Sequence, residues 1–450
     1  MMQKANALTR RQFASRAASA AALLGSGGRA LASPQAAPNA AQRAEQAADA
    51  GALIIDKVEG FVLRTPNLKV PYDEPMTMPP IGAMTGGEGI WNRLDHATPT
   101  RFKQFEQATL VKITTKNGLV GWGECHAPSA PRVHQTVISD LFAPLLRGQD
   151  ARWINPIWEH LYSSERMRGY STGSHLEALA GVDIALWDLL GKATNLPIYQ
   201  LLGGKYRDSL PVYTGVGGAT TEAAVKNAES AAARGMKLVK MSFHKGEGSS
   251  DFERVEAVAA AMRAHGGQLS LDSLGAFKLY EAVQMGHRLD KIGNIGWFED
   301  ALLPEDHAAY PILASSITTP ICAGETASTR FQIRDLLLAK AARMFNPDVC
   351  RAGGITECQR IAALADAYGT VWTPHVSTGT LLYFAASIHV GVATSNCILI
   401  EGGDKLTRPF GNALAKTKMV VENGMARVPE GPGHGVDFDE EALKAVTVVG

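Results

Sequence analysis

From residue 204 onward, short apolar runs alternate with longer helix-like stretches. Eight runs follow one another: LPVYTGV, KLVKMSF, LSLDS, IGWFED, ICAGE, MFNPD, VWTPH and ILIEG. Alternation of strand and helix is typical of parallel strands joined by crossover helices. Eight such strands close most simply into a barrel. The sequence therefore predicts an α/β fold, a (β/α)7β-type TIM barrel. The tail or an N-terminal domain would fill the position of the last helix.

The region before the barrel mixes strand and helix patterns. IIDKVEGFVL predicts a strand, and two alternating runs around Asn117-Gly118 are typical of a β-hairpin. A chain of 450 residues is long enough for a barrel and a companion domain. We therefore expect three parts: an α+β capping (lid) domain at 54–195, the barrel at 196–403, and a C-terminal segment at 404–450 that packs back on the capping domain.

The N-terminus has the order of features found in an export signal. Arg10 and Arg11 precede an alanine-rich apolar run that ends near Leu24, and ALA at 30–32 offers a cleavage site. Residues 1–32 are predicted to be a Tat-type signal peptide, read by the Tat export machinery, and 33–53 a linker. Export would place the protein in the periplasm or outside the cell, and the alternative is a plain disordered tail. The apolar run is too short for stable membrane insertion.

Charge and cysteine content exclude several classes of protein. The formal net charge is zero, which gives no support to nucleic-acid binding. Five scattered cysteines without a CxxC pair favour buried small side chains over a disulfide framework or a zinc site. We expect a homo-oligomer that acts on a small molecule.

An ionisable residue closes nearly every apolar run: Lys240, Asp272, Glu299, Glu325, Asp348, His375 and Glu401. Successive residue numbers differ by 32, 27, 26, 23, 27 and 26, which is about one βα unit each. The C-terminal ends of barrel strands meet at one mouth, where active sites lie. A single acid in this position could merely cap the next helix. Seven in register indicate a functional cavity.

Three of these residues predict a metal site. Asp272, Glu299 and Glu325 end adjacent strands, and like charges in one cavity repel unless a cation joins them. Carboxylate oxygens suit Mg²⁺ and leave positions for water and substrate. We therefore expect one Mg²⁺ per subunit. The alternative is a salt-bridge cluster, for which Lys240 is the basic residue on a neighbouring inward position.

His375 and Asp348 end adjacent strands and predict a general base. A carboxylate that hydrogen-bonds one ring nitrogen fixes the tautomer and raises the basicity of the other. A lone histidine is more often structural, but this one is paired beside a metal cavity. Glu401 could donate a proton or a hydrogen bond to a developing enolate oxygen, and its alternative role is a helix or lid contact.

These motifs resemble those of the enolase superfamily, in its mandelate racemase-like subgroup. GVDIALWDLLGKATNLPIYQLLGG is similar to the family's junction between capping domain and barrel. The likeness extends from Ile54 to the C-terminus through the motifs LSLDSLGAF, WFEDALLPED, PICAGET, NPDVCRAGGITE and TPHVSTG. The resemblance implies that Asp272, Glu299 and Glu325 are the Mg²⁺ ligands and that Lys240 is the first lysine of a Lys-x-Lys pair. It also implies that His375 and Asp348 form a His/Asp base dyad and that Glu401 is the acid of the eighth strand.

Two departures from the family pattern limit the reactions that the site residues can catalyse. Leu274 stands where the family often has Asn, and Ser242 replaces the second lysine of the pair. A serine hydroxyl has too high a pKa to act on the opposite face of the substrate carbon, so two-base racemisation is disfavoured. One base suffices for β-elimination, with Lys240 as an electrostatic stabiliser. The resemblance supplies the substrate class, and we expect a Mg²⁺-dependent acid-sugar (aldonate or aldarate) dehydratase, a hydro-lyase that yields a 2-keto-3-deoxy acid.

Two other functions remain open. One is a cycloisomerase or one-base epimerase of a sugar acid or lactone, and the other is an exported non-catalytic barrel that binds a carboxylate. Specificity is expected from the 66–100 loop and from the hairpin end around His126, acting as lids on the barrel mouth. Candidate substrate contacts, each with an ordinary surface position as its alternative, are Arg93, His96 and His244.

Overall fold

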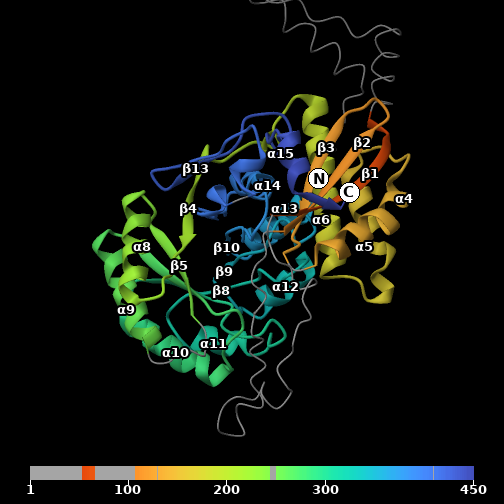
Figure 1. The fold of residues 1–450 in the computed structure, drawn as a ribbon. Coiled ribbons are helices and arrows are strands. Elements are labelled where there is room, and N and C mark those ends of the chain that lie inside the picture. The colour runs from red at the N-terminus through yellow and green to blue at the C-terminus, as the bar shows by residue number, and fades with distance from the viewer. Residues whose placement is uncertain (1–52, 66–106, 129, 244–249, 409, 450) are drawn as a thin grey trace, which may run out of the picture. The chain divides into compact units, whose positions relative to one another are not determined.

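The computed structural model describes residues 53–65, 107–128, 130–243, 250–408 and 410–449 (Figure 1). The predicted signal peptide, nearly all of the predicted linker, and the 66–100 loop with Arg93 and His96 lie outside the described residues, as does His244. Among the described helices, none has the length and apolar character needed to cross a membrane.

The N-terminal region is built on an antiparallel sheet with the strand order β14-β1-β2-β3. These strands are β14 (Thr447–Val449), β1 (Ile55–Arg64), β2 (Gln107–Thr115) and β3 (Val120–Cys125). The predicted β2–β3 hairpin is confirmed, with Gly118 at φ 86° in its turn. The helical elements of this region are α3 (Pro131–Thr136), η4 (Val137–Phe142), α4 (Ala143–Leu146), α5 (Ile154–Ser164), η5 (Arg166–Arg168), α6 (Ser174–Thr194) and α7 (Ile198–Leu201).

Helix α6 lies against β3 at a distance that requires glycine. A Cβ atom at Gly123 would lie 1.9 Å from the carbonyl oxygen of Gly181. Such an approach is impossible for any residue with a side chain. The close packing brings the polar residues of α6 and of the β3 end within reach of the barrel.

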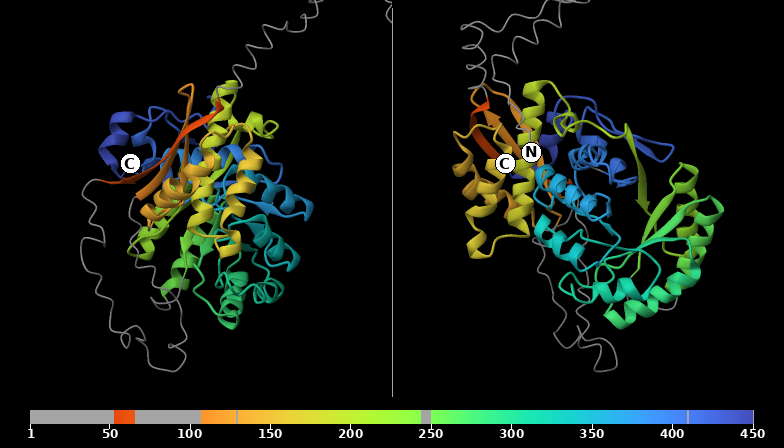
Figure 2. Two further views of the ribbon diagram at one scale, coloured as in Figure 1. Left: turned by 90° about the vertical axis from the view of Figure 1, so that its right-hand side faces the viewer. Right: turned by 180° about the vertical axis from the view of Figure 1, so that it is seen from behind.

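Eight parallel strands form the barrel: β4 (Ser209–Gly215), β5 (Leu238–Ser242), β6 (Gln268–Asp272), β7 (Ile295–Glu299), β8 (Ile321–Ala323), β9 (Met344–Phe345), β10 (Val371–Trp372) and β11 (Ile400–Glu401). The ring closes where β11 pairs with β4, and Trp372 and Cys397 form a parallel bridge beside it. The connecting helices are α8 (Thr221–Ala233), α9 (Ser250–Ala264), α10 (Leu279–Ile292), α11 (Tyr310–Ser316), α12 (Arg330–Leu338), α13 (Ile355–Ala367) and α14 (Leu381–Val392). Helices α8 to α11 lie outside the strands (Figure 2). The predicted (β/α)7β barrel is confirmed.

Three strands are shorter than their apolar runs. β8, β9 and β10 end two or three residues before Glu325, Asp348 and His375. Pro347 and Pro374 lack the N–H group that a ladder needs, which ends two of these strands early. Asp348 and His375 still face each other as an isolated parallel bridge, so the site residues keep the register of the strands.

The segment after β11 contacts both parts of the chain. The hairpin of β12 (Val421–Glu422) and β13 (Met425–Arg427) pairs with β4 of the barrel, and β14 pairs with β1. The short helices η6 (Lys405–Thr407) and η7 (Asn412–Leu414) precede this hairpin, and α15 (Glu440–Val446) lies between the hairpin and β14. All five cysteines are free and buried, which confirms their prediction as small core side chains.

Candidate active site

The acids predicted as metal ligands are brought together at the barrel mouth. Asp272 ends β6, Glu299 ends β7, and Glu325 follows β8. All three are buried, and one carboxylate oxygen of each lies within 4.8 Å of those of the other two. The distances suit shared coordination of one ion, and we refer to these three residues as the acid triad.

Lys240 reaches two of the triad. Its Nζ lies 3.1 Å from Asp272 Oδ2, 2.9 Å from Glu299 Oε1, and 3.4 Å from Oε1 of Glu401. The salt-bridge alternative is thus realised for Asp272 and Glu299. Glu325 instead contacts His375, whose Nε2 lies 3.3 Å from its Oε2, and Arg351, whose Nη1 lies 3.8 Å from its Oε1.

The triad still carries more negative charge than its neighbours offset. Burial raises the pKa of Glu299 to about 8, repulsion by Asp272 and Glu325 adds to this effect, and Lys240 opposes it. Burial likewise raises the pKa of Asp272. Oε2 of Glu325 is buried and, beyond the ion-pair contact with His375 Nε2 at 3.3 Å, has no hydrogen-bond partner among the described residues. Hard oxygen donors, excess charge and an unsatisfied oxygen fit a hard dication such as Mg²⁺.

His375 and Asp348 form the predicted pair. His375 Nδ1 lies 2.7 Å from Asp348 Oδ2, so the ring donates Nδ1–H to this buried carboxylate. The other nitrogen, Nε2, lies 3.3 Å from Glu325 Oε2. Burial lowers the pKa of His375, but Glu325, Glu401 and Asp348 together raise it to about 9. The reactive nitrogen therefore faces the acid triad.

Glu401 lies between the two basic groups of the site. Its Oε2 is 3.7 Å from His375 Nε2, and its Oε1 is on the Lys240 side. Burial alone would raise the pKa of Glu401, but Lys240, Lys405 and His375 lower it to about 2. An ionised carboxylate accepts hydrogen bonds, as it does from Val376 N at 3.2 Å. The role predicted from the sequence, donation of a proton or a hydrogen bond to an enolate oxygen, would first require protonation of this carboxylate.

The two departures from the family pattern both lie at the mouth. Ser242 pairs with Asp272 across the β5–β6 ladder and is exposed. Leu274 has a left-handed backbone at φ 48° and a side chain that is 47% exposed. A left-handed leucine costs about 1–2 kcal/mol, and the structure holds it by a bond from its own N–H to Asp272 Oδ1 at 3.3 Å.

His126, expected at a lid, is buried in a polar network. Its Nδ1 lies 3.1 Å from Glu177 Oε1, and its Nε2 lies 3.1 Å from Arg351 Nη2. Burial and Arg351 lower the pKa of His126, so its ring is neutral at neutral pH. Arg351 also donates to the backbone oxygen of Glu325 at 2.8 Å, which joins the capping region to a member of the acid triad.

Two buried carboxylates that sequence reasoning missed fix the helices behind the base pair. Glu124, at the end of β3, accepts bonds from Thr380 N at 2.8 Å and Thr380 Oγ1 at 2.6 Å, where α14 begins. Asp183 of α6 accepts bonds from Thr356 N at 3.0 Å and Thr356 Oγ1 at 2.6 Å, where α13 begins. Carboxylates stabilise helix N-termini. The capping region thus caps the helices that follow Asp348 and His375.

Glu124 predicts an unusual pH dependence of stability. Burial raises its pKa from 4.5 to about 7, against the bonds from Thr380. Between these values the folded protein holds a proton that the unfolded chain releases, so rising pH favours unfolding. Glutamine at position 124 does not titrate. The free energy of unfolding of Glu124→Gln, relative to that of the wild type, should therefore rise by about 3 kcal/mol between pH 4.5 and pH 8. Urea denaturation at both pH values measures this gain, and an equal difference at the two would contradict it.

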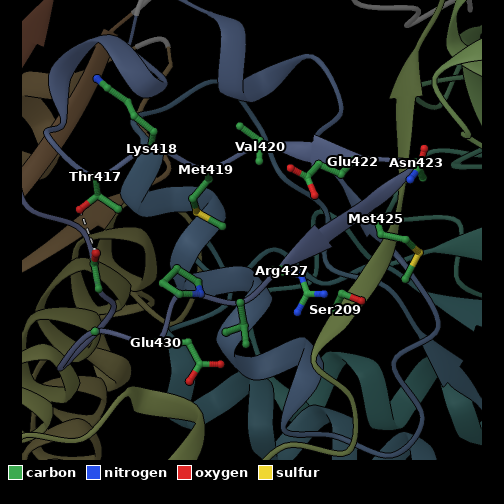
Figure 3. A pocket seen from close by; sticks show the side chains of 14 residues that line it. Ser209, Thr417, Lys418, Met419, Val420, Glu422, Asn423, Met425, Arg427 and Glu430 are labelled. Carbon is green, nitrogen blue, oxygen red and sulfur yellow. Dashed lines mark hydrogen bonds between the residues drawn. The ribbon is translucent and has the colours of Figure 1, made fainter.

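A separate cavity of about 500 Å³ lies over β13 and the C-terminal segment (Figure 3). Its lining includes Ser209, Lys418, Glu422 and Arg427, and none of the predicted site residues. We therefore place the chemistry at the acid triad.

Comparison with known proteins agrees with this geometry. A family model described as mandelate racemase / muconate lactonizing enzyme, N-terminal domain, matches residues 91–203, and one described as enolase C-terminal domain-like matches residues 223–442. D-galactarolactone cycloisomerase from Agrobacterium fabrum is 32% identical over 372 residues, which cover 78% of this chain and 95% of that protein. The chain belongs to the mandelate racemase/muconate lactonizing enzyme family, within the enolase superfamily.

Other members of the mandelate racemase/muconate lactonizing enzyme family are similarly related. D-galactonate dehydratase from Xanthomonas axonopodis pv. citri is 33% identical over 349 residues, covering 74% of this chain and 89% of that protein. The crystal structure of 3,6-anhydro-D-galactonate cycloisomerase from Zobellia galactanivorans is 28% identical, with a TM-score of 0.71 over 87% of this chain and 99% of that one. Enzymes of the superfamily generally use Mg²⁺, and the acid triad could hold such an ion.

Proposed function

We propose that this protein is a Mg²⁺-dependent acid-sugar dehydratase, acting on an aldonate or aldarate. The observation that carries the proposal is one imidazole, His375, held by Asp348 with Nε2 directed at the acid triad. Ser242 occupies the position of a second base and cannot act as one. Relatives named D-galactonate dehydratase support the reaction class and the substrate class.

The elimination needs one face of the substrate. His375 must be neutral to act as the base, a form that predominates only above its pKa of about 9. Its Nε2 then takes the α-proton, the C–H electrons form the double bond between Cα and Cβ, and the β-hydroxyl leaves. Protonated His375 returns the proton to that hydroxyl, so water departs and the base is regenerated. The enol product rearranges to the 2-keto-3-deoxy acid. When bound by the acid triad, Mg²⁺ would hold the substrate carboxylate and offset its developing charge.

Lys240 and Asp348 assist without taking part in the proton transfer. The ammonium of Lys240 lies among Asp272, Glu299 and Glu401, where it adds positive charge beside the carboxylate site. Asp348 fixes the tautomer of His375, because the Nδ1 proton is committed to its Oδ2.

A second candidate is a cycloisomerase or one-base epimerase of a sugar acid or lactone. It is supported by relatives named D-galactarolactone cycloisomerase and 3,6-anhydro-D-galactonate cycloisomerase. The same imidazole would take the α-proton, but no water would be lost.

Incubation with a library of aldonates, aldarates and their lactones separates these candidates. The Mg²⁺-loaded protein should convert at least one acid to a 2-keto-3-deoxy product, detected by semicarbazone absorbance. Exchange of the α-proton in D₂O without loss of water would favour the cycloisomerase or epimerase. Tight binding with neither exchange nor elimination would indicate a non-catalytic carboxylate-binding barrel.

Tat-type export to the periplasm or beyond remains a proposal that rests on the sequence of residues 1–32. A folded reporter fused behind these residues should be exported, and retention in the cytoplasm would contradict the signal.

A further inference from the structure

The carboxylate of Asp348 has a second side-chain donor. The hydroxyl of Tyr383 donates to Oδ2 at 2.5 Å, the same oxygen that receives Nδ1–H of His375 at 2.7 Å. Oδ1 receives the backbone N–H of Cys350 at 2.9 Å. Asp348 and Tyr383 are both buried. Charge-assisted bonds of this kind are short and strong, so Tyr383 competes directly with His375 for one oxygen.

Tyr383 is held firmly enough to act on this oxygen. It lies in the first turn of α14, whose N-cap residue Thr380 is bound by Glu124 from the capping region. Its ring packs against Gly379, where a Cβ atom would come within 2.5 Å of Cδ2. The hydroxyl therefore has little freedom to leave Asp348.

We propose that Tyr383 is a positioning residue of the base pair, which orients Asp348 and sets the strength of its bond to His375. The inference rests on the proposed function, in which His375 is the base. If Tyr383 merely filled the core, phenylalanine would serve equally well, because the two side chains differ by the hydroxyl alone. If Tyr383 is a positioning residue, loss of its hydroxyl leaves Oδ2 of Asp348 with one hydrogen-bond donor fewer and strengthens the bond of this oxygen to the imidazole.

The test uses Tyr383→Phe in the full-length, Mg²⁺-loaded protein. The ¹H NMR resonance of the His375 Nδ1 proton, assigned by its loss in His375→Asn, should move downfield, because Oδ2 has one donor fewer. In turnover, Asp348 loses the contact that orients it and the imidazole is less well placed, so kcat should fall on the order of 10-fold with KM unchanged. Tyr310→Phe is the matched control, since this buried hydroxyl donates to the Leu302 carbonyl oxygen at 2.8 Å and should leave both readouts at wild-type values.

A second substitution keeps the proposal testable if Tyr383→Phe fails to fold. Incorporation of 3-fluorotyrosine at position 383 retains the ring and makes the hydroxyl a stronger donor, so the resonance should move upfield. An unmoved resonance in the folded variants would overturn the proposal. The NMR readout needs no substrate, so it separates failure of this inference from failure of the proposed reaction.

Discussion

Replacing His375 with Asn is expected to abolish α-proton exchange and elimination almost completely. Loss of a general base lowers the rate by about 10²–10⁴-fold. The asparagine amide can still donate to Asp348, so the pocket should keep its shape and its affinity for Mg²⁺. Exchange of the α-proton in D₂O, followed by NMR with any accepted acid sugar, measures the effect directly.

Two comparisons make this result specific. His287→Asn changes an exposed histidine on α10 and should leave exchange at the wild-type rate. Adding Asp348→Asn to His375→Asn should lower the rate little further, because residues that act as a unit are not additive. Wild-type exchange in His375→Asn would mean that another group removes the proton.

Glu325→Gln is expected to remove the stabilisation that Mg²⁺ gives to the folded protein. At a Mg²⁺ concentration 100 times its dissociation constant, binding stabilises the native state by about 2.7 kcal/mol. Oε2 of Glu325 has an ion-pair contact with His375 but no hydrogen-bond partner among the described residues, so we expect this side chain to be a main ligand of the ion. Thermal denaturation with and without Mg²⁺ gives the measurement, which does not depend on turnover.

Asp300→Asn is the matched control for charge. Asp300 is buried next to Glu299, and burial together with Glu325 and Glu299 raises its pKa well above the ordinary range. It is not a member of the acid triad, and its left-handed φ of 38° suits asparagine. Mg²⁺ should stabilise this variant as it does the wild type. If Glu325→Gln also keeps the full effect, the acid triad is not the metal site.

Sequence periodicity was sufficient to predict the barrel and the strand-end residues. Strand and helix patterns are local, and a parallel barrel brings the C-terminal strand ends together whatever the details of the loops. Asp272, Glu299 and Glu325 therefore gather as expected, with His375 beside Asp348. The shortened strands were foreseeable in part, since Pro347 and Pro374 stand within the runs that were interpreted as strands.

The remaining contacts depend on partners distant in the chain. Glu124 meets Thr380 across 256 residues, and neither residue stands in a pattern that indicates the other. Tyr383 lies in LLYFAASIHVGV, where it is indistinguishable from an ordinary core aromatic. The pairing of Lys240 with two acids of the triad is set by side-chain reach, whereas the strand register places backbones alone.

The pairing of β14 with β1 has a consequence for biosynthesis. A ribosome adds about 5–20 residues per second, so β1 leaves the exit tunnel long before its edge partner at residues 447–449 has been translated. Until residues 447–449 emerge, that side of β1 offers unpaired backbone groups to other strands. A nascent chain stalled before residue 447 would thus carry a nearly complete barrel and an unpaired sheet edge that can pair with other chains, a state that chaperones would have to shield.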